Sequence, residues 1–226
     1  MNDLGTIWRT IEGEFVFLYH WITTFTTRWH IEGEHYLREA QANGRPLLLT
    51  FWHGQIPLFI MYGHRFMDPT TFHLVVVGDE RSDVLSRLAT RIGATPHAVD
   101  MQGNPVAAGR ATLQVLKALK KGNVSMLAPD GPDGPPYKPK NGIAFLAQKA
   151  EANVMPIGLW SRQSYQRKRW DHYMVPYPFA HIHMVFGQPI LVNKDDDTAA
   201  LLAQITEALN TVRTRAQVLA GITPWR

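Results

Sequence analysis

A histidine and an aspartate each stand at the end of an apolar stretch, close to a glycine. His53 follows the apolar run 46–52 and precedes Gly54, and Asp130 begins the loop 130–142 after the run 123–128. Histidine changes its charge near neutral pH, and a carboxylate bonded to one ring nitrogen fixes its tautomer and stabilises its protonated form. In open α/β sheets, functional groups gather where strands end and the loops to the following helices begin. Together, His53 and Asp130 predict a site that holds a general base.

Acyl transfer is a reaction that needs such a base. When an alcohol attacks a thioester, its hydroxyl proton must leave as the carbonyl carbon is attacked. The developing oxyanion needs hydrogen-bond donors, which backbone N–H groups near Gly54 or in the loop 130–142 could supply. Taken alone, His53 has a simpler explanation as a partly buried histidine that bonds to a neighbouring strand, so the interpretation depends on its combination with Asp130.

The composition excludes several other kinds of site. The chain has no cysteine, which excludes disulfides, thiolate catalysis and cysteine-ligated zinc, and fits a reducing compartment. The remaining histidines lack Asp-rich metal spacing, so a zinc or two-metal hydrolase is not expected. The acidic run 195–197 is typical of a helix N-terminus. We therefore expect neither a metal nor a cofactor.

The loop 130–142 has the composition of an anion-binding segment. Gly131 and Gly134 would let backbone amides approach a ligand. Lys138 and Lys140 add positive charge, and the helix that follows would present its positive N-terminal end. The alternative is a rigid turn, because the loop is stiffened whatever it binds by Pro132, Pro135, Pro136 and Pro139.

Charge and one amphipathic segment favour an anionic lipid surface. The net charge is +4 and the pI about 9.4, and no nucleic-acid-binding motif is found among the basic residues. From 6 to 27, helical spacing puts one apolar face on Ile7, Ile11, Phe15, Leu18 and Ile22. This helix is either a monotopic membrane anchor or an ordinary helix packed on the sheet. Its apolar part, 15–22, is too short to cross a bilayer.

A second basic and aromatic segment lies near the end of the chain. Arg162, Arg167, Lys168 and Arg169 precede Trp170. Such a segment suits an anionic headgroup, with cation–π stacking on the indole. A solvated turn between two strands explains it equally well, and the residues alone do not indicate catalysis.

The order of elements predicts a single α/β domain at 28–226 with a mostly parallel central sheet flanked by helices, after an N-terminal amphipathic helix at 1–27. The expected strands are 29–31, 46–52, 72–77, 95–99, 123–128, 154–160 and 181–186. The expected helices include a segment around 36–37, then 56–66, 83–92, 105–121, 142–151 and 197–219. Pro156 suggests an edge or bulge position for its strand.

The succession of motifs resembles the DUF374 group of the lysophospholipid acyltransferase superfamily over roughly residues 28–193. The motifs are Trp52-His53-Gly54, Pro129-Asp130-Gly131-Pro132, Met155-Pro156-Ile157-Gly158, Trp170-Asp171 and Gly187-Gln188-Pro189-Ile190. The resemblance implies transfer of a fatty acyl chain from acyl-CoA or acyl-carrier protein to a hydroxyl, or less often an amine, of a lysophospholipid-like acceptor. No covalent acyl-enzyme is implied.

The resemblance also implies site residues. His53 would be the base, and the substrate-binding residues would be Gly54, Gln55, Gly131, Asp133, Gly134, Lys138, Lys140 and Gly142. In the wider superfamily an acidic residue follows the histidine by five positions, where this chain has Leu58. Asp130 is the first candidate to replace it, with Asp79 and Asp83 in reserve. Related loops usually carry a basic residue at the position of Asp133, and a basic, serine-rich turn at 100–104.

Two other functions remain open from the residues: a lipid-binding homologue without catalysis, and a hydrolase of acyl esters or thioesters. The start of the chain has no basic segment or cleavage site typical of a signal peptide. We expect a cytoplasmic protein, peripheral on the inner face of the cell membrane, with an acyl donor, a lipid acceptor and anionic lipid as partners.

Overall fold

A seven-stranded sheet forms the centre of the molecule in the computed structural model, which describes residues 3–68, 73–77, 82–99, 105–121 and 124–222. Its strand order is β1-β9-β6-β2-β5-β3-β4, and all neighbours are parallel except β6 and β9. The strands are β1 (Arg28–Glu32), β2 (Leu47–Thr50), β3 (His73–Val77), β4 (Thr95–Val99), β5 (Ser125–Leu127), β6 (Asn153–Trp160) and β9 (His181–Phe186). The predicted α/β domain with a mostly parallel central sheet is confirmed.

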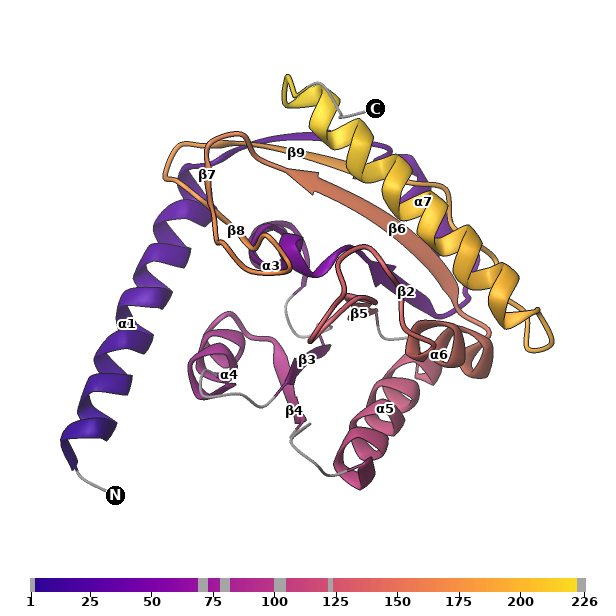
Figure 1. Ribbon diagram of the computed structural model, residues 1–226, viewed down its shortest axis with the longest axis horizontal. Helices are drawn as coiled ribbons and strands as arrows, with labels where there is room; N and C mark the ends of the chain where they lie inside the picture. Colours follow the sequence, from indigo (N-terminus) through magenta and orange to yellow (C-terminus); the bar gives the residue numbers. More distant parts are fainter. Residues whose placement is uncertain (1–2, 69–72, 78–81, 100–104, 122–123, 223–226) are drawn as a thin grey trace.

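Helices cover both faces of this sheet (Figure 1). One side carries α1 (Asp3–Thr26), α2 (Glu34–Ala42), α3 (Ile56–Phe66) and α4 (Ser82–Arg91). The other side carries α5 (Pro105–Lys120), α6 (Gly142–Ala150) and α7 (Thr198–Leu219). A short 3-10 turn, η1 (His53–Gln55), joins β2 to α3. Outside the sheet, β7 (Ser164–Gln166) and β8 (Met174–Pro176) form an antiparallel hairpin.

The apolar run that predicted β2 is explained by burial on both faces. Leu47 and Leu49 pack in the core beneath α3 and α4, while Leu48 packs in the second core beneath α5, α6 and α7. Successive side chains of a strand point to opposite faces, so a strand covered on both sides is apolar at every position. Because His53 follows this central strand, it lies at the edge of the sheet where β2 ends.

The expectation that Pro156 marks an edge strand or bulge is wrong. β6 lies between β9 and β2, inside the sheet. Pro156 is the last residue of β6 that pairs with β2, and Ile157 is the first that pairs with β9. The carbonyl oxygen of Pro156 accepts the N–H of Gly187. A proline is tolerated here because it stands where the strand changes its partner.

Helix α1 packs on the body of the protein through a face of mixed character, on which the partly buried Val16 and Phe17 contact the core. Its buried positions near the C-terminal end are His20, Thr23 and Thr24. The Arg91 guanidinium of α4 makes two hydrogen bonds to the Glu14 carboxylate, at 2.7 and 2.6 Å. Within the described ranges, no helix is long and apolar enough to cross a membrane.

Three features named from the sequence lie outside the described residues: the segment 100–104, Asp79 and the side chain of Asp83.

Near the C-terminal end of the chain, Asp197 caps α7 by accepting the N–H of Ala200 at 2.8 Å. That bond confirms the helix N-terminal role predicted for the acidic run.

Candidate active site

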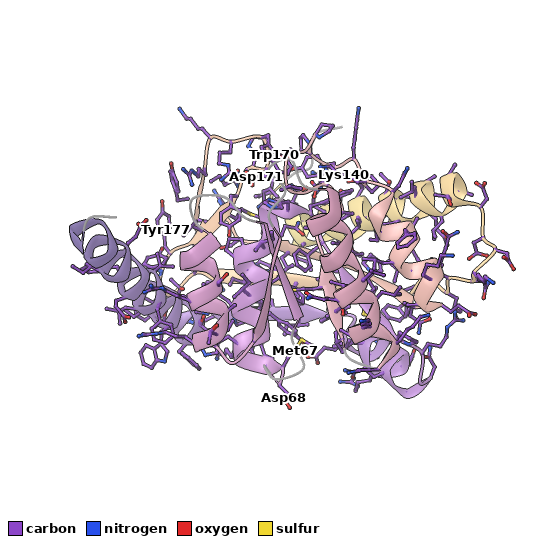
Figure 2. The ribbon with its side chains drawn as sticks, turned by 90° about the horizontal axis from the view of Figure 1, so that it is seen from below. Met67, Asp68, Lys140, Trp170, Asp171 and Tyr177 are labelled. Carbon is purple, nitrogen blue, oxygen red and sulfur yellow. The ribbon has the colours of Figure 1, made fainter. Side chains whose placement is uncertain are left out.

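Three neighbouring strands direct their loops to one edge of the sheet. β6, β2 and β5 are adjacent and parallel, so their carboxyl ends meet at the same edge. His53 follows β2, Asp130 follows β5, and Asp171 lies in the hairpin segment that follows β6. Figure 2 shows Lys140, Trp170 and Asp171 together at this edge. Met67 and Asp68 lie at the opposite one.

His53 pairs with Asp171. The His53 Nδ1–H donates to Asp171 Oδ2 at 2.9 Å, and the carboxylate side chain is fully buried while the imidazole is 20% exposed. A buried carboxylate on Nδ1 fixes the tautomer and stabilises a protonated ring. The arrangement leaves Nε2 as the ring nitrogen that can take a proton from a substrate.

Asp130 holds the backbone around His53 and does not hold its ring. One carboxylate oxygen accepts the His53 backbone N–H at 2.9 Å, and the other accepts the Tyr137 N–H at 3.1 Å. Burial raises the pKa of Asp130, and these two N–H groups partly offset that rise. The expectation that Asp130 replaces the missing acid is therefore corrected: Asp171 takes that position, and Asp130 fixes where the strand end and the loop 130–142 meet.

The usual position for the acid is apolar in this chain. Leu58 is on the first turn of α3, where it is fully buried in the core beneath that helix. It has no polar group that could pair with the His53 ring. The replacement therefore comes from a different loop.

Gly54 is needed because the Asp171 backbone lies against it. A Cβ at position 54 would overlap the Asp171 carbonyl oxygen and crowd the carbonyl of His172. The close approach of the two loops brings the Asp171 carboxylate to His53. Gly54 thus serves the assembly of the pair, where the resemblance implied substrate binding.

The glycines of the loop 130–142 face protein groups. A Cβ on Gly131 would meet the His53 ring, and one on Gly134 would meet the Trp170 indole. The Gly131 N–H donates to the Ala128 carbonyl and the Gly134 N–H donates to the Asp130 carbonyl. The N–H groups of these two glycines are therefore used within the loop, and ligand binding by this loop stays a prediction.

The other predicted substrate-binding residues divide into two groups. Asp133, Lys138 and Lys140 are exposed at this edge, and Gly142 begins α6 with open space where a side chain would lie. Gln55 is 2% exposed and borders a small internal cavity. The substrate contact implied for Gln55 by the resemblance stays a prediction, since its side chain is buried in this structure.

Aromatic side chains enclose the His53–Asp171 pair. The Trp170 ring lies 5.1 Å from the His53 ring, centroid to centroid, and the Tyr173 ring lies at 6.3 Å. Burial, with a contribution from the Asp171 charge, raises the pKa of Tyr173 to about 12, so its hydroxyl stays protonated at neutral pH. The Arg169 Nε is 3.7 Å from Asp171 Oδ1. Across the described residues, no three His, Asp or Glu side chains gather in a way that could hold a metal ion.

Sequence reasoning missed Asp171. The Trp170-Asp171 pair was noticed as a motif, but the basic residues before it directed attention to lipid headgroups. Two features of the sequence were available as a signal: the missing acid at Leu58, and a single carboxylate, Asp171, next to tryptophan in a segment otherwise rich in arginine and lysine.

A solved structure identifies the fold. The chain aligns with the crystal structure of the 1-acyl-sn-glycerophosphate (LPA) acyltransferase, PlsC, from Thermotoga maritima, with a TM-score of 0.53 and 17% identity, over 100% of this chain and 86% of that one. The chain has this acyltransferase fold. At 17% identity the likeness shows the fold alone.

Comparison with known sequences finds a relative of undescribed function. The uncharacterized protein RP090 of Rickettsia prowazekii (strain Madrid E) is 25% identical over 160 residues, which is 70% of each chain. No protein-family model matches the chain. Membership of the DUF374 group therefore stays a prediction.

Proposed function

We propose that this protein is an acyltransferase that moves a fatty acyl group from acyl-CoA or acyl-carrier protein to a hydroxyl, or an amine, of a lysophospholipid-like acceptor. The observation that carries the proposal is the His53–Asp171 pair, at 2.9 Å, at the edge of the sheet where functional groups of this fold class gather. The acyltransferase fold supports the reaction class.

In the proposed reaction, His53 Nε2 takes the proton from the acceptor hydroxyl as its oxygen attacks the thioester carbonyl carbon. The new C–O bond forms, the C–S bond breaks, and the proton passes from His53 to the departing thiolate. Asp171 stabilises the imidazolium between these two steps. The reaction needs no metal, no cofactor and no covalent acyl-enzyme.

The exposed cations at the same edge suit the donor. Lys138 and Lys140 lie in the loop 130–142, whose Gly131 packs against His53, and both are solvent-exposed. An acyl-CoA and the phosphopantetheine arm of acyl-carrier protein both carry phosphate, at the opposite end of the pantetheine chain from the reacting thioester. Lysine binds phosphate as a mobile point charge, so these two residues are our candidates for donor binding.

Helix α1 supports action at a membrane surface. Its outward face carries Phe15, Leu18 and Phe25, with exposed fractions of 68%, 52% and 47%. These residues share one face because their spacing is helical, and the opposite face, with Val16, Phe17, His20 and the threonines, packs on the body. A helix that keeps a row of large apolar side chains in solvent is suited to lie in the headgroup region of a bilayer.

A neighbouring loop extends this face. The Tyr19 hydroxyl donates to the Pro176 carbonyl at 2.7 Å, and the Phe179 N–H donates to Thr26 Oγ1 at 3.2 Å. These bonds hold the loop beside the C-terminal end of α1, where Phe179 is 70% exposed. We therefore propose that the protein is peripheral on the inner face of the cell membrane, with this surface in contact with anionic lipid.

Lipid mass spectrometry of a defined reaction tests the function. Purified protein is mixed with acyl-CoA and acyl-carrier-protein donors, a lysolipid mixture and vesicles. His53→Ala is run in parallel, with His35→Ala as the matched control because His35 is an exposed histidine of α2. We expect an acylated lipid that forms with the natural protein and with His35→Ala but not with His53→Ala. Free fatty acid alone would indicate a hydrolase, and no product across both donors would favour a lipid-binding protein.

A further inference from the structure

A small cavity lies beside Asp171. Its volume is about 10 Å³, which is roughly the space that one water molecule needs. Asp171 lines it together with Trp52, Gln55, Trp160 and Arg213. It belongs to no substrate path described above, since Gln55 and Trp52 are buried.

Five of the nine residues around the cavity share an unusual property. Each of the five carries a buried polar atom that finds no hydrogen-bond partner among the described residues: Asp171 Oδ1, Trp52 Nε1, both amide atoms of Gln55, Trp160 Nε1 and Arg213 Nε. A buried polar atom without a partner costs about 1–3 kcal/mol, so several such atoms around one space are rarely left unpaired. The set is also chemically complementary, with the Asp171 and Gln55 oxygens as acceptors and several N–H donors. The Arg169 Nε, 3.7 Å from the same Asp171 oxygen, is too far for a hydrogen bond and leaves that oxygen able to accept one.

The fold holds Arg213 at this cavity. Its guanidinium stacks 3.9 Å above the Tyr137 ring. Its backbone lies close to the sheet because α7 crosses β6 at Gly158. A Cβ at Gly158 would overlap the Val212 carbonyl, so the glycine allows this close approach. Arg213, which belongs to α7, therefore lines the same cavity as Asp171. It is the only arginine on the cavity wall as described.

We propose that Gln55, Trp160 and Arg213 form, through one water molecule bound in this cavity, a positioning cluster for Asp171. The water donates to Asp171 Oδ1 and accepts from the Gln55 amide, the Trp160 indole or the Arg213 guanidinium. The carboxylate is then fixed at both oxygens, with Oδ2 on His53 Nδ1. The inference rests on the proposed role of the His53–Asp171 pair and extends it to residues that touch no substrate.

The first test reads the imidazole directly, without any acyl transfer. In ¹⁵N-histidine-labelled protein, neutral His53 of the natural chain is expected in the Nδ1–H form that donates to Asp171. Gln55→Leu and Arg213→Met each remove polar atoms at similar volume, and each should lower the Nδ1–H population. Arg213→Lys keeps a cationic donor and should retain it. Asn153→Ala is the matched control, because Asn153 is fully buried at the other end of β6.

The second test reads the water and the rate. A high-resolution crystal structure should show density in the cavity within hydrogen-bonding distance of Asp171 Oδ1. In acyl transfer, kcat should fall about tenfold in Gln55→Leu and Arg213→Met with KM unchanged, as expected when a supporting shell is loosened. An empty cavity would overturn the role of water, and an unchanged tautomer in both variants would overturn the positioning cluster. Absence of turnover in the natural protein would count against the proposed function and leave the tautomer result intact.

Discussion

Asp171 reaches His53 from a loop 118 positions further along the chain, and the two side chains are joined at 2.9 Å. The loop that carries Asp171 is packed so tightly on the turn after β2 that its carbonyl oxygen occupies the place of a side chain at Gly54. The pair is therefore built from two loops, which are held together by their backbones. Variants can separate the chemistry of the pair from its assembly.

Replacement of the two aspartates should have different consequences. Asp171→Asn keeps the shape but no longer favours the Nδ1–H tautomer or the imidazolium, so we expect kcat to fall about 10³-fold with a small change in stability. Asp130→Asn puts an amide N–H₂ against one of two backbone N–H groups, and should lower the free energy of unfolding by about 1–3 kcal/mol. Steady-state kinetics measure kcat, and urea denaturation measures the free energy of unfolding, for both variants. Equal kcat losses with equal stability losses would contradict the separate roles.

A methyl group at Gly54 should separate the loops. Gly54→Ala would push the added Cβ into the Asp171 carbonyl oxygen, and a shift of the carboxylate by about 1 Å can cost about 10²-fold in rate. Gly142→Ala is the matched control, because nothing lies within 4 Å of a Cβ there and alanine suits the first turn of α6. The activity of both variants is measured, with circular dichroism to check that each is folded. A fully active Gly54→Ala would show that the loop contact does not position Asp171.

Charges on the outward face of α1 should release the protein from lipid. Phe15→Glu combined with Leu18→Glu places two carboxylates on the exposed apolar face, and we expect vesicle binding to fall at least tenfold in sedimentation with anionic liposomes. Leu113→Glu is a suitable control, since Leu113 is 53% exposed on α5. Binding that survives the double substitution would place the lipid contact elsewhere on the surface.

The packing of α1 should weaken in acid. Burial and the neighbouring His64 lower the pKa of His20 from 6.5 to about 4, and the two rings are bonded at 3.1 Å. The unfolded chain takes up this proton near pH 6.5 and the folded protein only near 4, so stability falls as the pH drops through that window. The loss is on the order of 2–3 kcal/mol at pH 4.

Thermal melts at pH 7.5 and 4.5 check this prediction. The natural protein should lose more Tm between the two values than His20→Leu, by roughly 5 °C for a chain of this size. His35→Leu, at an exposed position of α2, should behave like the natural protein. If His20→Leu is as acid-sensitive as the natural chain, His20 is not the group that titrates.

The parts of this molecule that follow from local patterns were predictable. The uninterrupted apolar residues of β2 indicated a strand covered on both faces, and Gly54 indicated a turn, so His53 was placed correctly between β2 and α3. Helix α3 was predicted with its observed bounds, Ile56–Phe66. These features depend on neighbours in the chain, where side-chain periodicity carries the information.

What could not be predicted depends on contacts between distant segments. The segment from Arg162 to Tyr173 has no periodicity that orients its side chains, so nothing local indicates that Asp171 is the buried one. The function of Asp130 was misjudged for the same reason, since its partners are backbone N–H groups brought in by folding. The helical stripe of α1 was recognised, but only the packed structure shows which of its faces meets the protein.

The separation of the pair along the chain has a consequence for biosynthesis. A nascent chain that has passed α6 already contains His53, Asp130 and the whole loop 130–142, yet it still lacks its acid. The pair is complete only after the hairpin of β7 and β8 has left the ribosome and folded back onto Gly54. In a protein with the acid five positions after the histidine, both groups would emerge almost together. Here the growing chain carries a histidine that has no carboxylate on its ring until most of the polypeptide has been made.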